Sequence, residues 1–150
     1  MDNRLKDAII LSVAHTSLPS SQEGITKHMN ILAIDFGTKN IGLARASIAV
    51  KVAMPFGIVR TVDELVKLIQ QEKIEKIIIG LPLGLGGEEN KNTARVRNFA
   101  DELKQKTGLP VEFISEIFSS QAADRMGGGA SRDEKSAMVI LQSYLHKISA

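Results

Sequence analysis

The chain has 150 residues, of which 43% are hydrophobic, and a formal net charge of +2. This length and hydrophobic content are enough for one compact domain with its own core, and the near balance of charge only mildly favours an anionic partner. The sequence contains no cysteine, which excludes disulfides, thiolate catalysis and cysteine-ligated zinc or iron–sulfur sites. Its three histidines are scattered, so we expect oxygen ligands for any metal, which indicates Mg²⁺ or Mn²⁺.

Residues 1–28 read as an N-terminal extension. Residues 4–14 could form a short helix, and the polar stretch 16–24 is typical of a linker. Two explanations remain open: translation that starts at Met29, or a peripheral helix docked on the domain formed by residues 29–150. The apolar runs are too short to span a bilayer and no signal-peptide cleavage site is apparent, so we expect a cytoplasmic protein without membrane contact.

From Met29 the pattern predicts a strand hairpin followed by a third strand. Residues 30–35 form an apolar run that ends on a carboxylate, a turn containing glycine and asparagine follows, and residues 41–46 resume as a strand. Residues 51–59 predict a third strand, in which Pro55 indicates an edge or a bulge.

Beyond residue 60 helical and strand patterns alternate. Two further strands are predicted at residues 77–79 and 111–114, and helices at residues 62–70, 93–106, 119–126 and 132–147. Strands linked by helices are typically parallel. The sequence therefore predicts an α/β fold in which helices flank a five-stranded mixed sheet.

Three carboxylates occupy similar places in this predicted fold. Asp35 ends the first strand, Glu116 follows the fifth, and Asp133 begins the final helix. Each has an ordinary alternative role, as a turn residue, a solvated surface charge or a helix cap. If the strand ends and the helix start meet at one edge of the sheet, however, the three repel one another unless cations neutralise them. Hydrolysis of phosphodiesters by two divalent ions uses this arrangement.

Candidate contacts for a nucleic-acid backbone come from basic residues and a glycine-rich loop. The basic residues are Lys39, Lys91, Arg95 and Arg97. The loop at residues 84–90 could present backbone amides to a phosphate. A solvated helix face and a surface connection are the simpler explanations, and the sequence leaves both open.

Three sequence blocks resemble the YqgF/RuvX family. The first, IDFGTKNIGLA at residues 34–44, is similar to the family's opening D-x-G-x-x-x-I-G-x-A pattern. The second combines GLPL at residues 80–83 with Gly87 and with residues 93–94 and 99–100, and the third runs from Asp133 to residue 145. The resemblance implies an RNase H-like fold and a nuclease in 5′-end maturation of pre-16S rRNA, or alternatively a Holliday junction resolvase.

The same resemblance implies Asp35, Glu116 and Asp133 as catalytic residues and ligands of Mg²⁺ or Mn²⁺. It implies structured RNA or branched DNA as partner, with pre-ribosomal particles as a further partner, and leaves open a monomer or a homodimer.

One block departs from the family pattern. Ser115 and Ile117 replace the acidic residue and the arginine that commonly flank Glu116. Isoleucine cannot replace a bidentate phosphate contact, so a weakened enzyme or a non-catalytic nucleic-acid-binding module is a rival hypothesis. A third hypothesis is an ATP-binding domain of the actin and sugar-kinase type, which residues 35–38 resemble, although such proteins need two domains and this chain has room for one.

Overall fold

The computed structural model describes residues 29–115, 123 and 125–149. The predicted N-terminal extension, Glu116, Ile117 and most of the predicted helix 119–126 lie outside these residues. The elements, in chain order, are β1 (Asn30–Phe36), β2 (Ile41–Ser47), β3 (Met54–Val59), α2 (Val62–Gln71), β4 (Lys76–Leu81), α3 (Lys91–Thr107), β5 (Val111–Ser115) and α5 (Arg132–Ser149).

The five strands form one mixed sheet in the order β3-β2-β1-β4-β5. β1 pairs antiparallel with β2 and parallel with β4, and β5 pairs parallel with β4. The predicted mixed sheet is therefore confirmed, with β1 at its centre. Since β1, β4 and β5 run in the same direction, their carboxyl ends lie along the same edge of the sheet.

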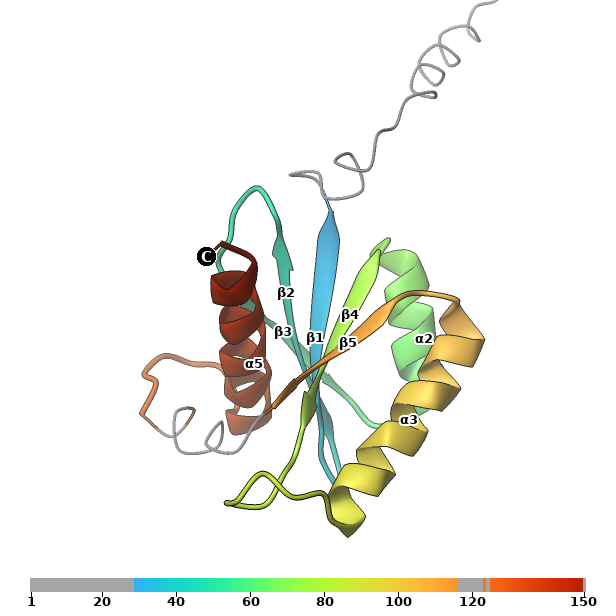
Figure 1. Cartoon of the computed structure of the whole chain (residues 1–150). Coiled ribbons are helices and arrows are strands. Elements are labelled where there is room, and N and C mark those ends of the chain that lie inside the picture. Colours follow the sequence, from blue (N-terminus) through green and yellow to red (C-terminus); the bar gives the residue numbers. More distant parts are fainter. Residues whose placement is uncertain (1–28, 116–122, 124, 150) are drawn as a thin grey trace, which may run out of the picture.

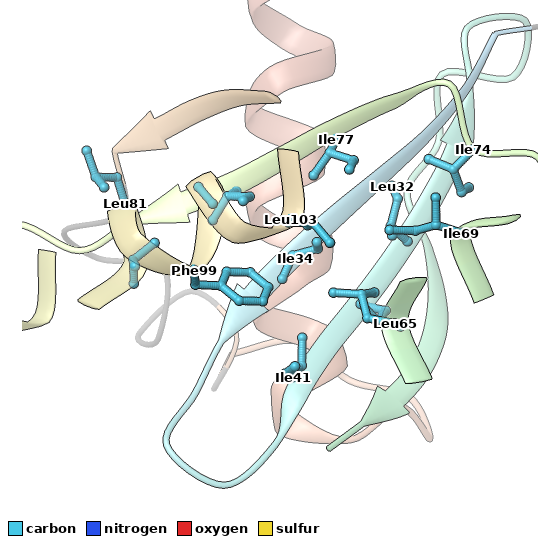
Figure 2. Packing of buried hydrophobic residues seen from close by; sticks show 14 residues of the cluster. Leu32, Ile34, Ile41, Leu65, Ile69, Ile74, Ile77, Leu81, Phe99 and Leu103 are labelled. Carbon is cyan, nitrogen blue, oxygen red and sulfur yellow. The ribbon is translucent and has the colours of Figure 1, made fainter. Parts of the chain in front are cut away.

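Helices α2 and α3 lie on one face of the sheet and α5 lies on the other (Figure 1). The sheet thereby separates two hydrophobic clusters. Successive side chains of a strand point to opposite faces. Leu32 and Ile34 of β1 pack with α2 and α3, as Figure 2 shows, whereas Ile31 and Ala33 pack with α5. All four are fully buried. The continuous apolar run in β1 therefore reflects burial on both faces of the sheet.

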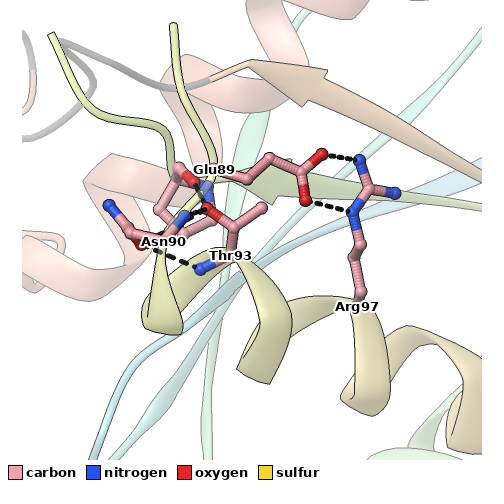
Figure 3. A network of polar contacts seen from close by, with 5 residues as sticks. Glu89, Asn90, Thr93 and Arg97 are labelled. Carbon is pink, nitrogen blue, oxygen red and sulfur yellow. Dashed lines mark hydrogen bonds and ion pairs between the residues drawn. The ribbon is translucent and has the colours of Figure 1, made fainter.

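Helix α3 begins two residues earlier than predicted. Its N-cap is Asn90, whose side chain accepts hydrogen bonds from the amides of Asn92 and Thr93. Thr93 completes a capping box and donates from its hydroxyl to the carbonyl of Pro82 at 2.5 Å (Figure 3). This bond ties the start of α3 to the chain leaving β4.

β3 is shorter than predicted, because residues 51–53 do not belong to it. The amides of Val50 and Lys51 donate to the carbonyl of Ser47, and Lys51 has a φ of 60°, so this stretch closes a turn. The strand begins at Met54 and lies at the edge of the sheet, where Pro55 is tolerated. None of the helices in the described part of the chain is long and apolar enough to cross a membrane.

Candidate active site

Asp35 lies near the carboxyl end of β1, opposite Gly42 of β2. The hairpin turn that follows is closed by its own backbone, through a 3.0 Å hydrogen bond from the Gly37 amide to the Asn40 carbonyl. The Asp35 carboxylate instead accepts a hydrogen bond from the hydroxyl of Ser136, a buried residue of α5. Asp35 therefore faces the final helix.

Asp133 lies in the first turn of α5 but does not cap it. Ser131 and Glu134 form the reciprocal cap: the Glu134 amide donates to Ser131 Oγ at 3.2 Å, and the Ser131 amide donates to Glu134 Oε1 at 3.0 Å. The Asp133 carboxylate accepts a hydrogen bond from Asn40 Nδ2 at 3.3 Å. The capping role that the sequence allowed for Asp133 is thus taken by its neighbours.

Gly42 allows α5 to approach the β1–β2 hairpin. A Cβ atom placed on Gly42 would overlap the backbone carbonyl of Asp133 and lie 2.8 Å from its Cβ. Because Gly42 is also the ladder partner of Asp35, the missing side chain lets the start of the helix sit directly beside that residue. The structure therefore brings together Asp35 and Asp133, which are far apart in the sequence.

The charge of Asp35 is disfavoured in this position. Burial and, to a lesser extent, the nearby Asp133 carboxylate raise the pKa of Asp35 to about 6. Arg132, the Ser136 hydroxyl and Arg95 act in the opposite direction without cancelling the rise. A buried carboxylate whose ionised form is disfavoured, with a second carboxylate nearby, is a suitable site for a divalent cation, because the positive charge would stabilise the ionised form of Asp35.

Glu116, the third predicted carboxylate, lies outside the described residues. β5 ends at Ser115, which pairs with Leu81 at the same sheet edge as Asp35. Among the residues that the structure describes, no group of three or more histidine, aspartate or glutamate side chains could hold a metal ion. Asp35 and Asp133 form a pair there, and the set of three stays a prediction.

A pocket of about 250 Å³ lies beside Asp35. It is formed where the β1–β2 hairpin, the chain after β4 and the start of α3 meet. Its lining combines one carboxylate and one guanidinium with polar and apolar neighbours: Asp35, Phe36, Gly37, Thr38, Pro82, Asn92 and Arg95. Asp35 is thus reached from a surface that carries hydrogen-bond donors.

The four predicted nucleic-acid contacts differ in their surroundings. Lys39 in the hairpin turn and Lys91 at the start of α3 are exposed. Arg97 forms a two-point ion pair with Glu89, with distances of 3.1 and 2.6 Å, which Figure 3 shows. Arg95 donates to backbone carbonyls directly after Asp35. The two lysines are therefore the more accessible phosphate contacts.

The glycine-rich loop uses its amides internally. Gly86 donates to Glu88 Oε1 at 3.0 Å, Gly84 donates to the Glu88 carbonyl at 2.8 Å, and Gly87 donates to the Gly84 carbonyl at 2.8 Å. These three amide donors already have acceptors, which indicates that the loop is a structured surface connection rather than a phosphate-binding loop.

The polar groups that contact the two aspartates were not predicted from the sequence. Asn40 and Ser136 contact Asp133 and Asp35 respectively, and neither is distinctive alone. A signal was present for Ser136, which lies three residues after Asp133 and hence on the same helix face. Gly42 also carried a signal, because a glycine within a strand often marks a close backbone approach.

Comparison with known proteins gives a family match over most of the chain. The model described as "RuvX: Holliday junction resolvase" matches residues 29–147. A protein of Maridesulfovibrio salexigens named "Putative pre-16S rRNA nuclease" is 38% identical over 132 residues, covering 78% of this chain and 98% of its own. A protein of the same name from Dictyoglomus turgidum is 34% identical, covering 81% and 96%.

Among solved structures the chain is similar to RuvC. Thermus thermophilus RuvC in complex with a Holliday junction substrate matches with a TM-score of 0.56 and 13% identity, over 82% of this chain and 97% of that one. A second Thermus thermophilus RuvC structure matches with a TM-score of 0.54 and 12% identity, over 81% and 96%. At such identity the likeness shows the fold alone, and it confirms the predicted RNase H-like architecture.

Proposed function

The chain belongs to the RuvX Holliday junction resolvase family, and from that membership we propose that it is a divalent-metal-dependent nuclease acting on the precursor of 16S ribosomal RNA. The observation that carries this proposal is the contact region between the end of β1 and the start of α5. Asp35 and Asp133 meet there, Gly42 makes the approach possible, and both ordinary roles of these aspartates are taken by other groups.

The donor set suits Mg²⁺ or Mn²⁺, since it consists of carboxylate oxygens and contains no sulfur. Asp35 and Asp133 would hold the ion, and we propose Glu116 as a third ligand. The bound ion would supply activation of water and stabilisation of the leaving oxygen. Asn40 and Ser136 hold the two carboxylates by hydrogen bonds. Hydrolysis joins a water oxygen to phosphorus and breaks one P–O bond, and the leaving oxygen takes up a proton.

The name of the curated relatives supports ribosomal RNA as the substrate. Exposed Lys39 and Lys91 are sequence neighbours of Thr38 and Asn92, which line the Asp35 pocket, and we propose that they contact phosphates on either side of the cleaved bond. Arg97 would contribute only after leaving Glu89. We propose pre-ribosomal particles as the setting in which the RNA is met.

A four-way DNA junction is the second candidate substrate. The description of the family model and the junction bound in the similar RuvC structure support it. RNA and DNA share the phosphodiester that the carboxylate pair would act on, so cleavage of matched probes distinguishes between them.

The test is cleavage by the full chain of two probes, an RNA spanning the 5′ end of 16S rRNA with its precursor sequence and a synthetic four-way DNA junction. We expect cleavage of the RNA in Mg²⁺ or Mn²⁺, and a loss of about 100-fold or more in Asp35→Asn. Asp101→Asn, an exposed aspartate of α3, is the matched control and should cleave normally.

The outcomes separate the rival functions. Cleavage of the junction alone would support the resolvase. Binding of either probe without turnover would support a non-catalytic module, for which the changes at Ser115 and Ile117 are the motivation. Cleavage that Asp35→Asn leaves intact would place the activity elsewhere.

A further inference from the structure

Arg95 connects α3 to the residues that follow Asp35. Its Nη2 donates to the carbonyl of Phe36 at 3.3 Å, and its Nη1 donates to the carbonyl of Gly37 at 3.4 Å. The guanidinium therefore binds the backbone on the carboxyl side of Asp35 at two successive carbonyls. Within the described part of the chain, Arg95 is the side chain that donates to these two carbonyl groups.

The remaining donors of Arg95 are largely taken up as well. Nε and Nη2 donate to Asn92 Oδ1 at 3.2 and 3.0 Å, so this side chain fixes the guanidinium from within α3. A guanidinium has five N–H groups. These four hydrogen bonds leave one N–H, on Nη1, for any further acceptor.

Aromatic packing holds the same segment. The Arg95 guanidinium carbon lies 4.6 Å from the centroid of the Phe36 ring. Phe36 also stacks on Phe99, with centroids 4.0 Å apart and ring planes within 9°. Arg95 and Phe99 are one helical turn apart on α3. The helix therefore contacts Phe36, the residue next to Asp35, by one cation–π and one stacking contact.

We infer that Arg95 is a positioning residue, which fixes the end of β1 and so orients the Asp35 carboxylate, rather than a phosphate contact. A phosphate would have to compete for donors that already bind carbonyls and Asn92, whereas Lys39 and Lys91 carry exposed charges. This inference rests on the proposed nuclease function, because orientation of Asp35 matters only if Asp35 takes part in the reaction.

The test compares turnover with nucleic-acid affinity in Arg95→Lys and Arg95→Ala. Lysine keeps the charge but cannot bind two carbonyls and Asn92 together. We expect kcat to fall about 10- to 100-fold in both variants, since small misplacements at a reacting centre have effects of this size. The Kd for the RNA probe, measured without divalent metal, should stay within about twofold, with an unchanged salt dependence.

Three further variants make the comparison interpretable. Lys39→Ala is the phosphate-contact reference, expected to weaken binding and lower the salt slope by about 0.7 to 1. Asn92→Ala removes the acceptor that fixes Arg95 and should lower kcat in the same direction with normal Kd, which covers the case in which an Arg95 variant folds poorly. Lys104→Ala, exposed at the far end of α3, is the matched neutral control.

The inference is overturned if Arg95→Lys keeps full turnover, or if Arg95→Ala weakens binding and lowers the salt slope as Lys39→Ala does. It is equally overturned if Asn92→Ala leaves kcat unchanged. Failure of the proposed function gives a different result, because the wild-type chain would then show no metal-dependent turnover at all.

Discussion

At the scale of single residues, Asp35 is held in an environment that disfavours its charge. Burial and the Asp133 carboxylate together raise its pKa to about 6 from an ordinary value of 3.8. Below about pH 6 the protonated form of Asp35 therefore predominates in the metal-free fold, and above it the carboxylate is ionised at a cost in stability. Well below pH 4 the group is protonated in folded and unfolded chains alike, so its contribution to stability is neutral there.

This environment predicts that the metal-free protein loses stability as the pH rises from about 4 through about 6. Asp35→Asn removes the charge, so we expect it to stabilise the metal-free chain at pH 7 by about 1–3 kcal/mol. Urea denaturation in EDTA at pH 4 and pH 7 measures this difference. Asp101→Asn should show no such gain, and an Asp35→Asn variant as stable as wild type at both pH values would contradict the prediction.

Gly42 is the second residue on which the site depends. A methyl group at this position would overlap the Asp133 backbone carbonyl, so Gly42→Ala forces α5 away from the hairpin. We expect a loss of about 1–3 kcal/mol in the free energy of unfolding, together with a loss of cleavage.

Gly129→Ala is the matched control for Gly42→Ala. A Cβ at Gly129 meets nothing within 4 Å, so that variant should lie within about 0.5 kcal/mol of wild type. Equal effects of the two substitutions in urea denaturation would show that close approach at Gly42 is not what the fold requires.

At the scale of elements, the start of α5 is fixed by contacts that leave Asp133 available. Glu134 accepts from the Ser131 amide through one oxygen and from the Gly57 amide of β3 through the other, at 2.7 Å. Although burial acts to raise the pKa of Glu134, these hydrogen bonds bring it below its usual value. The start of α5 is thus hydrogen-bonded to the edge strand β3 on one side and packs closely against Gly42 on the other.

This anchoring predicts a specific difference between two helix caps. Ser131→Ala on α5 and Thr61→Ala on α2 each remove a capping hydroxyl and should each lower stability by about 1 kcal/mol. Only Ser131→Ala should also raise the Mn²⁺ concentration needed for half-maximal cleavage, because only α5 carries Asp133. A Thr61→Ala variant with the same shift in metal dependence would contradict this assignment.

The elements themselves were largely predictable from hydrophobic periodicity. The buried runs of β1 and β4 and the amphipathic helix α2 stood out, and their predicted bounds lie within two residues of the observed ones. The predicted start of β3 at residue 51 was wrong. The turn that ends at Lys51 depends on a left-handed backbone at that residue, and no glycine in the sequence indicated it. The start of α3 depended on recognising Asn90 as a cap.

The site was predictable only in part. Strand ends and a helix start indicated Asp35 and Asp133, and the structure brings these two together. From the sequence, Arg95 and Arg97 were both predicted as nucleic-acid contacts, because both are positive charges on one helix. Their different partners, backbone carbonyls for one and Glu89 for the other, depend on tertiary contacts that spacing does not reveal.

At the scale of the whole molecule, the site joins three parts of the chain at one edge of the sheet. The end of β1 supplies Asp35, α5 reaches it across one face, and α3 reaches it across the other (Figure 1). The family match spans residues 29–147. We therefore propose residues 29–150 as the nuclease domain and residues 1–28 as an extension to it.

We propose that the meeting of Asp35 and Asp133 creates a metal-binding nuclease centre. The most direct test is the anomalous scattering of crystals of the full chain soaked in Mn²⁺. We predict a manganese peak bound by carboxylate oxygens of both aspartates, and its absence in crystals of Asp133→Asn. Manganese bound only elsewhere on the protein, with the Asp35 and Asp133 carboxylates contacting no ion, would contradict the account.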